Sequence, residues 1–123
     1  MHGTYEDGFP FIEIGVIGSG GNVSTFKVIV DTGFNGYLSL PYAVAFPIGL
    51  TLVGTGSGRV ADGNFSPYLK CIGTVAYGDK KVPTVIDVQQ NSRPLLGTAL
   101  LKELGCILTV NAMSGKTFLE QVR

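Results

Sequence analysis

Short stretches in which apolar residues alternate with polar or small ones recur along most of this chain, and a period of two predicts β-strands. Phe11 to Ile17 and Val23 to Val30 are two such strands, and the glycine-rich segment 18–22 between them predicts a hairpin. A longer hairpin is predicted from residue 51 to residue 77. Its tip is the segment from Arg59 to Asn64, in which an Asp-Gly pair favours a tight turn.

One segment has the spacing of a helix instead. From Leu95 to Gly105, leucines at positions 100, 101 and 104 fall on one helical face, Thr98 is the predicted N-cap and Gly105 the predicted C-terminal glycine. Residues 42–50 are ambiguous and allow a short helical turn broken at Pro47. Many short strands with a single late helix predict an all-β domain, closed or sandwiched. The remaining predicted strands are Tyr37–Leu40, Val82–Val88, Cys106–Val110 and Thr117–Val122.

Composition narrows the class of protein. The 123 residues suffice for one compact domain, 1–123, and the segment 1–8 is expected to be a flexible N-terminal extension. Nine basic and nine acidic residues balance, which argues against nucleic acid or an anionic membrane surface as a partner. No apolar run approaches the ~20 residues of a membrane span, and the first residues lack the pattern of a signal peptide. A cytoplasmic location is therefore expected.

Most catalytic chemistries lack the residues that they need. The only histidine is His2, in the segment expected to be flexible, which disfavours Ser-His-Asp, Cys-His and zinc sites. Cys71 and Cys106 lie far apart in the sequence and are interpreted as small buried hydrophobic residues. The glycine clusters 18–21 and 54–59 lack the spacing and the following helix of a phosphate-binding loop. We therefore expect no metal and no organic cofactor.

Asp31 is the exception, because it follows the apolar run Val28-Ile29-Val30 and begins a Thr-Gly turn. A carboxylate is costly to place at the end of a buried strand unless it is hydrogen-bonded or has a task. An Asx turn, in which the carboxylate accepts a local backbone N–H, would satisfy it without any function. Two companions favour a functional role. Leu95-Leu96-Gly97 leads into the predicted helix, and the hairpin tip Ala61-Asp62-Gly63 lies between the two motifs.

These features together resemble the retropepsins, the single-lobe aspartic proteases of retroviruses and their cellular and bacterial relatives. The resemblance extends from about Phe11 to Val122. Val30-Asp31-Thr32-Gly33 matches the catalytic turn, residues 59–64 match the flap that closes over substrate, and residues 94–101 match the segment that crosses the active-site loop. The string from Asp31 to Pro41 looks closer to prokaryotic members. The resemblance implies a closed acid-protease-like β-barrel with a flap hairpin and one short C-terminal helix.

The family resemblance also implies an activity, that of an aspartic endopeptidase in which two carboxylates share one proton and activate a water. This chain has a single Asp-Thr-Gly turn, so Asp31 is half of a site and a homodimer must supply the second carboxylate. The resemblance further implies that Thr32 bonds across the axis to the partner's backbone and that the carbonyl of Gly33 faces a peptide substrate. Because the activated water is the nucleophile, this mechanism needs no cofactor.

Residues of the flap and of the turn are further candidates for substrate contact. Ala61, Asp62 and Gly63 are expected to lie over a bound peptide, although Asp62 alternatively only completes the hairpin turn. Phe34 stands where viral members usually carry alanine. Its ring either reshapes a substrate subsite or packs under the flap.

The second motif, Leu95-Leu96-Gly97-Thr98, departs from the viral pattern at its last residue. Asn35 and Thr98 replace the Asp and Arg that form an ion pair near the viral interface, and a neutral hydrogen bond between them is predicted. In viral members the chain ends interleave into a shared sheet. Few residues follow Leu119 here, so the construction of the dimer interface stays open.

Two other functions compete with the protease. A non-catalytic module would use the same barrel for dimerisation or peptide binding, since a fold does not fix a function. The intact turn Asp31-Thr32-Gly33 favours the enzyme over this module. A generic small β-barrel with a chance motif explains neither the flap nor Leu95-Leu96-Gly97.

Overall fold

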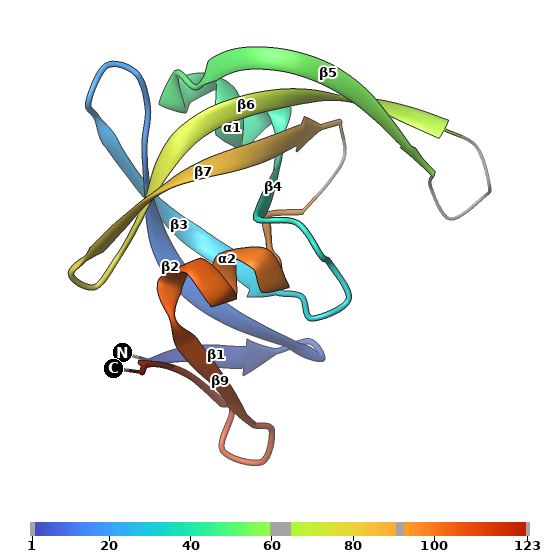
Figure 1. Cartoon of the computed structure of the whole chain (residues 1–123). Coiled ribbons are helices and arrows are strands. Elements are labelled where there is room, and N and C mark those ends of the chain that lie inside the picture. Colours follow the sequence, from blue (N-terminus) through green and yellow to red (C-terminus); the bar gives the residue numbers. More distant parts are fainter. Residues whose placement is uncertain (1, 60–64, 91–92, 123) are drawn as a thin grey trace.

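Figure 1 shows a computed structural model of the chain, which describes residues 2–59, 65–90 and 93–122. The described part is rich in strands and contains two short helices. The elements are β1 (His2–Glu6), β2 (Phe9–Ile17), β3 (Val23–Val30), β4 (Leu38–Pro41), α1 (Tyr42–Ile48), β5 (Thr51–Arg59), β6 (Phe65–Tyr77), β7 (Lys80–Gln89), β8 (Leu95–Leu96), α2 (Thr98–Leu104), β9 (Cys106–Asn111) and β10 (Lys116–Gln121).

The strands belong to one sheet with the order β5-β6-β7-β4-β8-β3-β2-β1-β10-β9 among the described residues. An additional pairing joins β2 to β6, with Val16 opposite Val75, so that β6, β7, β4, β8, β3 and β2 close into a ring. In Figure 1 the β5–β6 hairpin arches over one end of the molecule, and β1 and β9 lie at the other end. The all-β prediction is confirmed.

The core of the molecule lies inside this ring, because strand residues that alternate in the sequence also alternate in burial. Along β2 and β7, for example, every second side chain is buried and its neighbours are more exposed. Leucines of α2 complete the core from one side. The largest fully buried side chains among the described residues are those of Ile12, Ile14, Val16, Val28, Leu38, Leu40, Val75, Ile86, Leu96, Leu100, Leu104 and Leu119.

A second helix, α1, corrects the prediction of a single late one. Its residues Ala45 and Ile48 are buried three positions apart, so a helical turn covers the core where a strand could not. The helix is not broken at Pro47, because Pro47 lies inside it and the helix continues to Ile48. Gly49 ends the helix with a left-handed backbone, φ 77°, and donates its N–H to the carbonyl of Phe46.

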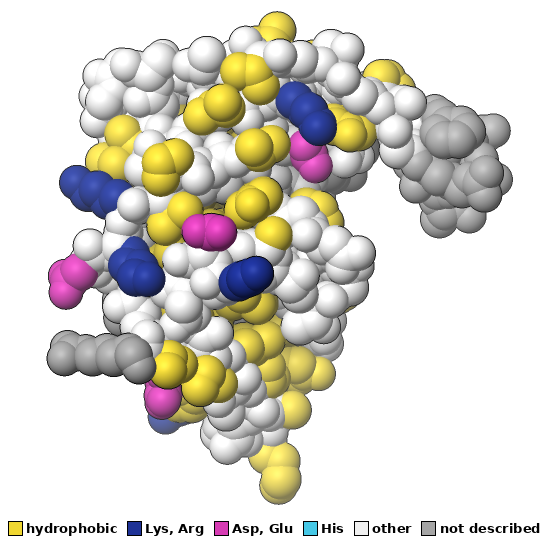
Figure 2. All heavy atoms as spheres, in the orientation of Figure 1, with side chains coloured by type: hydrophobic (Ala, Val, Ile, Leu, Met, Phe, Trp, Pro, Cys, Tyr) yellow, Lys and Arg dark blue, Asp and Glu magenta, His cyan; other side chains and the backbone are white. Residues whose placement is uncertain are grey.

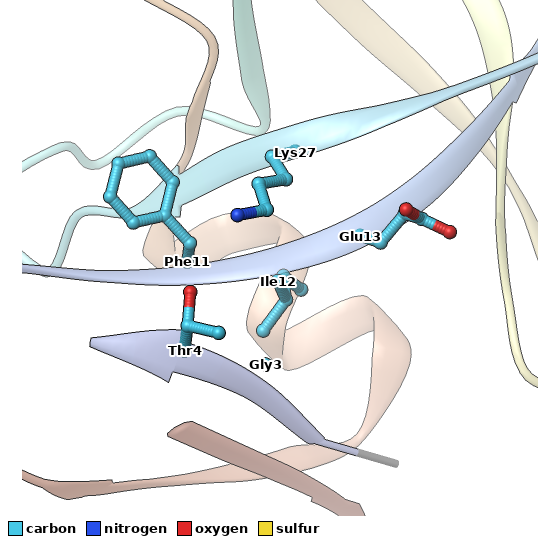
Figure 3. A pocket seen from close by; sticks show the side chains of 6 residues that line it. All are labelled: Gly3, Thr4, Phe11, Ile12, Glu13 and Lys27. Atoms are coloured by element: carbon cyan, nitrogen blue, oxygen red, sulfur yellow. The ribbon is translucent and has the colours of Figure 1, made fainter. Parts of the chain in front are cut away.

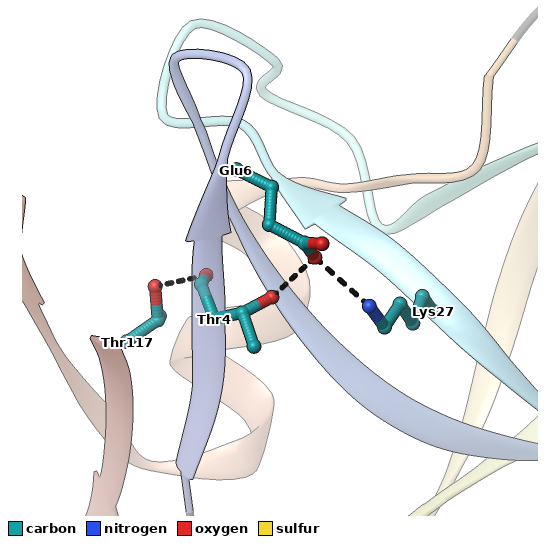
Figure 4. A network of polar contacts seen from close by, with 4 residues as sticks. All are labelled: Thr4, Glu6, Lys27 and Thr117. Carbon is teal, nitrogen blue, oxygen red and sulfur yellow. Dashed lines mark hydrogen bonds and ion pairs between the residues drawn. The ribbon is translucent and has the colours of Figure 1, made fainter. Parts of the chain in front are cut away.

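The N-terminal segment, expected to be flexible, instead forms strand β1 in the interior of the sheet. Its neighbours are β2, where Thr4 pairs with Phe11, and β10, where Thr4 pairs with Lys116. A chain of polar contacts fixes the strand (Figure 4): Thr117 Oγ1 donates to the carbonyl of Thr4 at 2.7 Å, and Thr4 Oγ1 donates to Glu6 Oε2 at 2.6 Å. Lys27 Nζ donates to the same Glu6 oxygen at 2.8 Å. These long-range partners explain why local sequence did not reveal the strand.

The predicted helix from Leu95 begins three residues later than expected. Leu95 and Leu96 form β8 between β3 and β4, and the N-cap is Gly97 with no side-chain cap, so Thr98 is not the cap. The sheet takes the two leucines because both neighbouring strands offer backbone partners to them. Gly105 ends α2 with a left-handed φ of 65°, as its position in the sequence predicts. Neither described helix is long and apolar enough to cross a membrane.

Candidate active site

Two segments that are distant in sequence meet where β3 ends. Strand β8 runs parallel to β3, with Leu96 beside Val30, and antiparallel to β4, with Leu96 opposite Leu38. Asp31 follows Val30 directly, so its backbone leaves the sheet beside the Leu-Leu-Gly motif. The structure therefore brings together Asp31 and Leu95-Leu96-Gly97, the two motifs that the sequence analysis singled out.

Backbone hydrogen bonds tie the loop after Asp31 to the start of α2. Loop and helix thus form one unit, in which the peptide groups of the turn have fixed partners and little freedom to move. The bonds run from Asp31 N to Leu96 O at 2.9 Å, from Gly97 N to Tyr37 O at 2.9 Å, from Thr98 N to Phe34 O at 2.9 Å and from Ala99 N to Gly36 O at 3.2 Å.

Gly97 is the point of closest approach between these two segments. A Cβ atom placed on Gly97 would lie 2.1 Å from the carbonyl oxygen of Gly36, far inside van der Waals contact. The φ of Gly97 is −95°, which any residue can adopt, so the requirement for glycine is one of space. The glycine of the second motif therefore lets the helix segment cross the loop of the first.

The Asp31 carboxylate is oriented by its own turn. Gly33 N donates to Asp31 Oδ1 at 2.9 Å, and Phe34 N donates to the Asp31 carbonyl at 3.1 Å, which confirms the Asx turn. No second hydrogen bond to this carboxylate is present within the described residues. Thr32 and Gly33 are exposed beside it. One carboxylate oxygen is thus held in place while the other stays available to a water or to another carboxyl group.

Asp31 and Thr32 line a hollow of about 400 Å³ whose walls are largely apolar. Arg93 stands at this hollow with its guanidinium 4.8 Å from the centre of the Phe9 ring, a cation–π distance. The walls come from β2, β3, β8 and β9 and from the residues beside them. The other lining residues are Pro10, Ile29, Val30, Leu95, Leu108 and Val110.

The sequence analysis singled out neither Phe9 nor Arg93. Phe11 pairs with Ile29 in the β2–β3 hairpin, and continuing this antiparallel register sets Phe9 opposite Asp31. The register of the predicted hairpin was therefore the signal that could have found Phe9. No comparable signal exists for Arg93, because its segment joins β7 to β8 without a regular pattern.

The ring of Phe34 packs against the loop in which it lies. Its ring atoms lie 2.6 Å from where a Cβ on Gly36 would stand and 2.7 Å from where a Cβ on Gly97 would stand. The two roles expected for this ring, at a substrate subsite or under the flap, stay predictions. The predicted hydrogen bond between Asn35 and Thr98 is wrong, because Thr98 Oγ1 donates to the Phe34 carbonyl at 3.4 Å instead.

The two arms of the hairpin that was predicted to carry a flap are present as β5 and β6, which pair up to Arg59 opposite Phe65. The tip residues Ala61, Asp62 and Gly63 lie outside the described residues. A hollow of about 280 Å³ separates β6 from the loop after Asp31, between Tyr68 on β6 and Gly36 on the loop. Asp87 lines this hollow, and burial raises the pKa of its carboxyl group, while the Lys70 ammonium acts in the opposite direction.

The other chemistry-bearing groups in the described segments form no second site of comparable kind. Among the described residues, no three His, Cys, Asp or Glu side chains gather as a metal site would require. Cys71 is buried and Cys106 half-buried, and burial raises the pKa of both thiols. A further hollow of about 270 Å³ between β1, β2 and β3 (Figure 3) is lined by Gly3, Thr4, Phe11, Ile12, Glu13 and Lys27.

Comparison with known proteins gives a relation in structure and none in sequence. No family model matches the chain, and no curated protein sequence does. Among solved structures, EIAV protease complexed with the inhibitor HBY-793 superposes with a TM-score of 0.70 over 88% of this chain and 100% of that protease, at 20% identity. The chain has the fold of a retroviral protease. In the retroviral protease fold of this chain, the Asp31 turn and the Leu-Leu-Gly crossing lie side by side.

Proposed function

We propose that this chain is an aspartic endopeptidase that is active as a homodimer. One observation carries the proposal: Asp31, at the end of a buried strand, is held by Gly33 N and opens onto a largely apolar hollow. A carboxylate that served only to complete its turn would need no such hollow. The retroviral protease fold adds support, because it is the fold of a peptidase.

The reaction requires two carboxylates and each chain supplies one. In the proposed dimer, Asp31 faces Asp31 of the partner subunit across a twofold axis, and the pair shares one proton. The ionised member takes a proton from a water, the water oxygen attacks the peptide carbonyl carbon, and the protonated member donates its proton to the carbonyl oxygen. The carboxyl group that received the water proton then gives it to the peptide nitrogen, the other carboxylate takes a proton from a hydroxyl of the diol, and the C–N bond breaks. This restores the pair with one shared proton.

Thr32 and Gly33 support the carboxylate in this proposal. Both are exposed beside Asp31, where a second chain and a substrate would approach. The Thr32 hydroxyl is proposed to bond to the backbone of the partner subunit, and the Gly33 carbonyl to accept a hydrogen bond from an extended peptide. The Gly33 N–H is already committed to Asp31 Oδ1, which leaves only its carbonyl for substrate.

The substrate is proposed to be an extended peptide or protein segment. It binds along the cleft as an added strand and is covered by the flap, whose arms are β5 and β6. The apolar walls of the Asp31 hollow suit hydrophobic side chains next to the cleaved bond. The cation of Arg93, which stands over Phe9 at this hollow, favours substrates with an acidic residue nearby.

Cleavage of a mixed peptide library tests the proposal, with mass spectrometry of the products between pH 3 and pH 8. The native chain is expected to cleave, and Asp31→Asn is expected to lose at least about 100-fold in rate, the scale of a general acid–base contribution. Asp7→Asn, an exposed change in the turn before β2, is the matched control and keeps the native rate.

Two outcomes contradict the proposed activity. If Asp31→Asn cleaves as fast as the native chain, another mechanism or a contaminant is responsible. If neither protein cleaves any peptide while light scattering shows a dimer, the chain is a non-catalytic module for dimerisation or peptide binding.

A further inference from the structure

Asn35 is the only asparagine of this chain that is followed by a glycine. In such a pair the backbone nitrogen of the glycine can attack the side-chain amide carbon of the asparagine, since the two atoms close an unstrained five-membered ring. Glycine has no Cβ to hinder that approach, and its backbone adopts the required conformation easily. The pair Asn35-Gly36 is therefore where the sequence most favours spontaneous loss of ammonia.

The pair lies in the irregular part of the loop that follows Asp31. The turn of Asp31 ends at Phe34, whose N–H donates to the Asp31 carbonyl at 3.1 Å, and strand β4 begins only at Leu38. Asn35 is exposed. Its side chain has no hydrogen-bond partner among the described residues, so the amide is free to turn toward the Gly36 nitrogen.

The attacking atom, the Gly36 nitrogen, is also unengaged. The Gly36 carbonyl accepts from Ala99 N at 3.2 Å and the Phe34 carbonyl accepts from Thr98 N at 2.9 Å. The N–H of Gly36, in contrast, has no hydrogen-bond partner within residues 2–59, 65–90 and 93–122. A hydrogen bond on that N–H would have to break before the nitrogen could lose its proton. The fold thus leaves open the one N–H on which the reaction depends.

The packing of the loop favours a glycine at position 36. A Cβ on Gly36 would lie 2.6 Å from atoms of the Phe34 ring, so any larger residue would require that ring to move. The same glycine that leaves room for the ring leaves the backbone nitrogen unhindered. The fold therefore favours the neighbour that makes Asn35 reactive.

The loop lies in a segment without charge. No Asp, Glu, Lys or Arg stands between Asp31 and Arg59 in the sequence. Figure 2 shows the surface beside α2, where Figure 1 places this loop, as largely white, which marks side chains that are neither charged nor hydrophobic. A carboxylate formed at position 35 would be the first charge in segment 32–58 and would lie four residues after Asp31.

We propose that Asn35 is a site of spontaneous deamidation in the folded protein and that the product loosens the loop after Asp31. The Gly36 nitrogen gives its proton to hydroxide and bonds to the side-chain carbon of Asn35, and the amide nitrogen leaves as ammonia. Water then opens the cyclic imide. Opening at the side-chain carbonyl gives aspartate, and opening at the backbone carbonyl gives isoaspartate, in which the main chain runs through the side-chain carbon. No oxidant or reductant takes part.

Isoaspartate at position 35 disturbs the fit between the loop and α2. The carbonyls on either side of Asn35, those of Phe34 and Gly36, accept from Thr98 N and Ala99 N, which are neighbours in the sequence. Isoaspartate inserts one more carbon into the main chain between these two acceptors. The two hydrogen bonds then cannot both keep their lengths and angles, so the loop is held less firmly behind the Asp31 turn.

Ageing of the folded chain at pH 8 for several days tests the site, with mass spectrometry of tryptic peptides. The peptide 28–59, whose only asparagine is Asn35, is expected to gain about 1 Da as its amide becomes a carboxylic acid. Asn22 is the internal control, because it is exposed but followed by a valine, and its peptide, which ends at Lys27, is expected to keep its mass. At pH 6 the change is expected to be slower, since the Gly36 nitrogen must lose a proton.

Asn35→Gln and Asn22→Gln are the matched variants. Glutamine keeps the amide but has to close a six-membered ring, which forms far more slowly. After ageing, Asn35→Gln is expected to keep its net charge in isoelectric focusing and its urea midpoint. The native chain and Asn22→Gln are expected to gain one negative charge and to unfold at lower urea. Hydrogen exchange at the Thr98 and Ala99 amides should be faster in the aged native chain.

A chain unfolded in urea is aged in parallel, because the Asn35-Gly36 pair reacts there without restraint from the fold. If only the unfolded chain changes at Asn35, the fold protects the pair and the proposed site is overturned. It is overturned as well if Asn35→Gln gains the same charge, since the change then lies elsewhere. If the folded chain changes but Thr98 and Ala99 exchange as before, the site is supported and its effect on the loop is overturned. None of these measurements uses peptide cleavage, so the proposed peptidase activity stands or fails separately.

Discussion

At the scale of single residues, Gly97 shows how the site depends on the absence of one side chain. Its Cα hydrogen faces the Gly36 carbonyl, and the Phe34 ring packs on both glycines. The turn that orients Asp31 is therefore supported from behind by a contact that tolerates no methyl group. Residues behind the turn thus fix the position of the carboxylate.

Gly97→Ala is expected to lower the free energy of unfolding by about 2 kcal/mol, because its Cβ overlaps the Gly36 carbonyl and backbone must move to make room. Urea denaturation measures the loss, and the peptidase rate should fall with it as the Asp31 turn shifts. Gly20→Ala is the matched control, since a Cβ there has open space and an ordinary φ. Equal stability of the two variants would refute the close approach.

The titration of Asp87 is expected to make the free energy of unfolding depend on pH, which urea denaturation measures. Burial raises the pKa of its carboxyl group in the folded chain, with Lys70 opposing, so folding favours the protonated form. The contribution of Asp87 to stability is then fully present below about pH 4, the range of an unfolded aspartate, and is lost as pH rises through the folded pKa. Asp87→Asn is therefore expected to gain stability relative to the native chain as pH rises from 4 to 7.

Urea denaturation of Glu6→Gln is expected to show the opposite change of stability with pH. Hydrogen bonds from Lys27 and then Thr4 lower the pKa of Glu6 in the folded chain. Its stabilising contribution is present at neutral pH and is lost as pH falls through the folded pKa. Because the pair is exposed, the effect is small, and the variant should be slightly weaker at pH 7 and equal to the native chain in acid. If the stability of both variants relative to the native chain changed with pH in the same direction, the two opposite pKa shifts would be contradicted.

At the scale of elements, β1 converts a polar N-terminal segment into an interior strand. The buried hydroxyl of Thr117 donates to the Thr4 carbonyl across the β1–β10 pairing, at 2.7 Å. Thr117→Val keeps the shape and removes the donor, and is expected to cost about 1–2 kcal/mol in the free energy of unfolding. Thr117→Ser, which keeps the hydroxyl, should lose less. Hydrogen exchange should be faster at the β1 amides of the valine variant.

The elements also show which parts of the fold can be predicted from the sequence. β3 was predicted with its observed bounds, and the turn of Asp31 with it, because apolar periodicity and turn residues are local signals. Leu95 and Leu96 were assigned to the helix because their spacing continues it; pairing with β3 and β4 overrode that spacing. β1 depends on a partner far along the chain, β10, which no local pattern encodes, whereas the register of the β2–β3 hairpin could have located Phe9.

At the scale of the whole molecule, the ring of strands delivers one carboxylate to an open end and leaves β9 as an unpaired edge beside it within the described chain. Under the proposed function, Asp31 is half of a catalytic pair, and a chain gains the other half only through a second copy. Activity and assembly would then be a single equilibrium.

That coupling has a quantitative consequence in mixtures of subunits. If native and Asp31→Asn chains are refolded together in equal amounts, random pairing leaves about a quarter of the dimers with two carboxylates, so the rate per total chain should fall to about a quarter of the native value. Independent sites would instead retain about half.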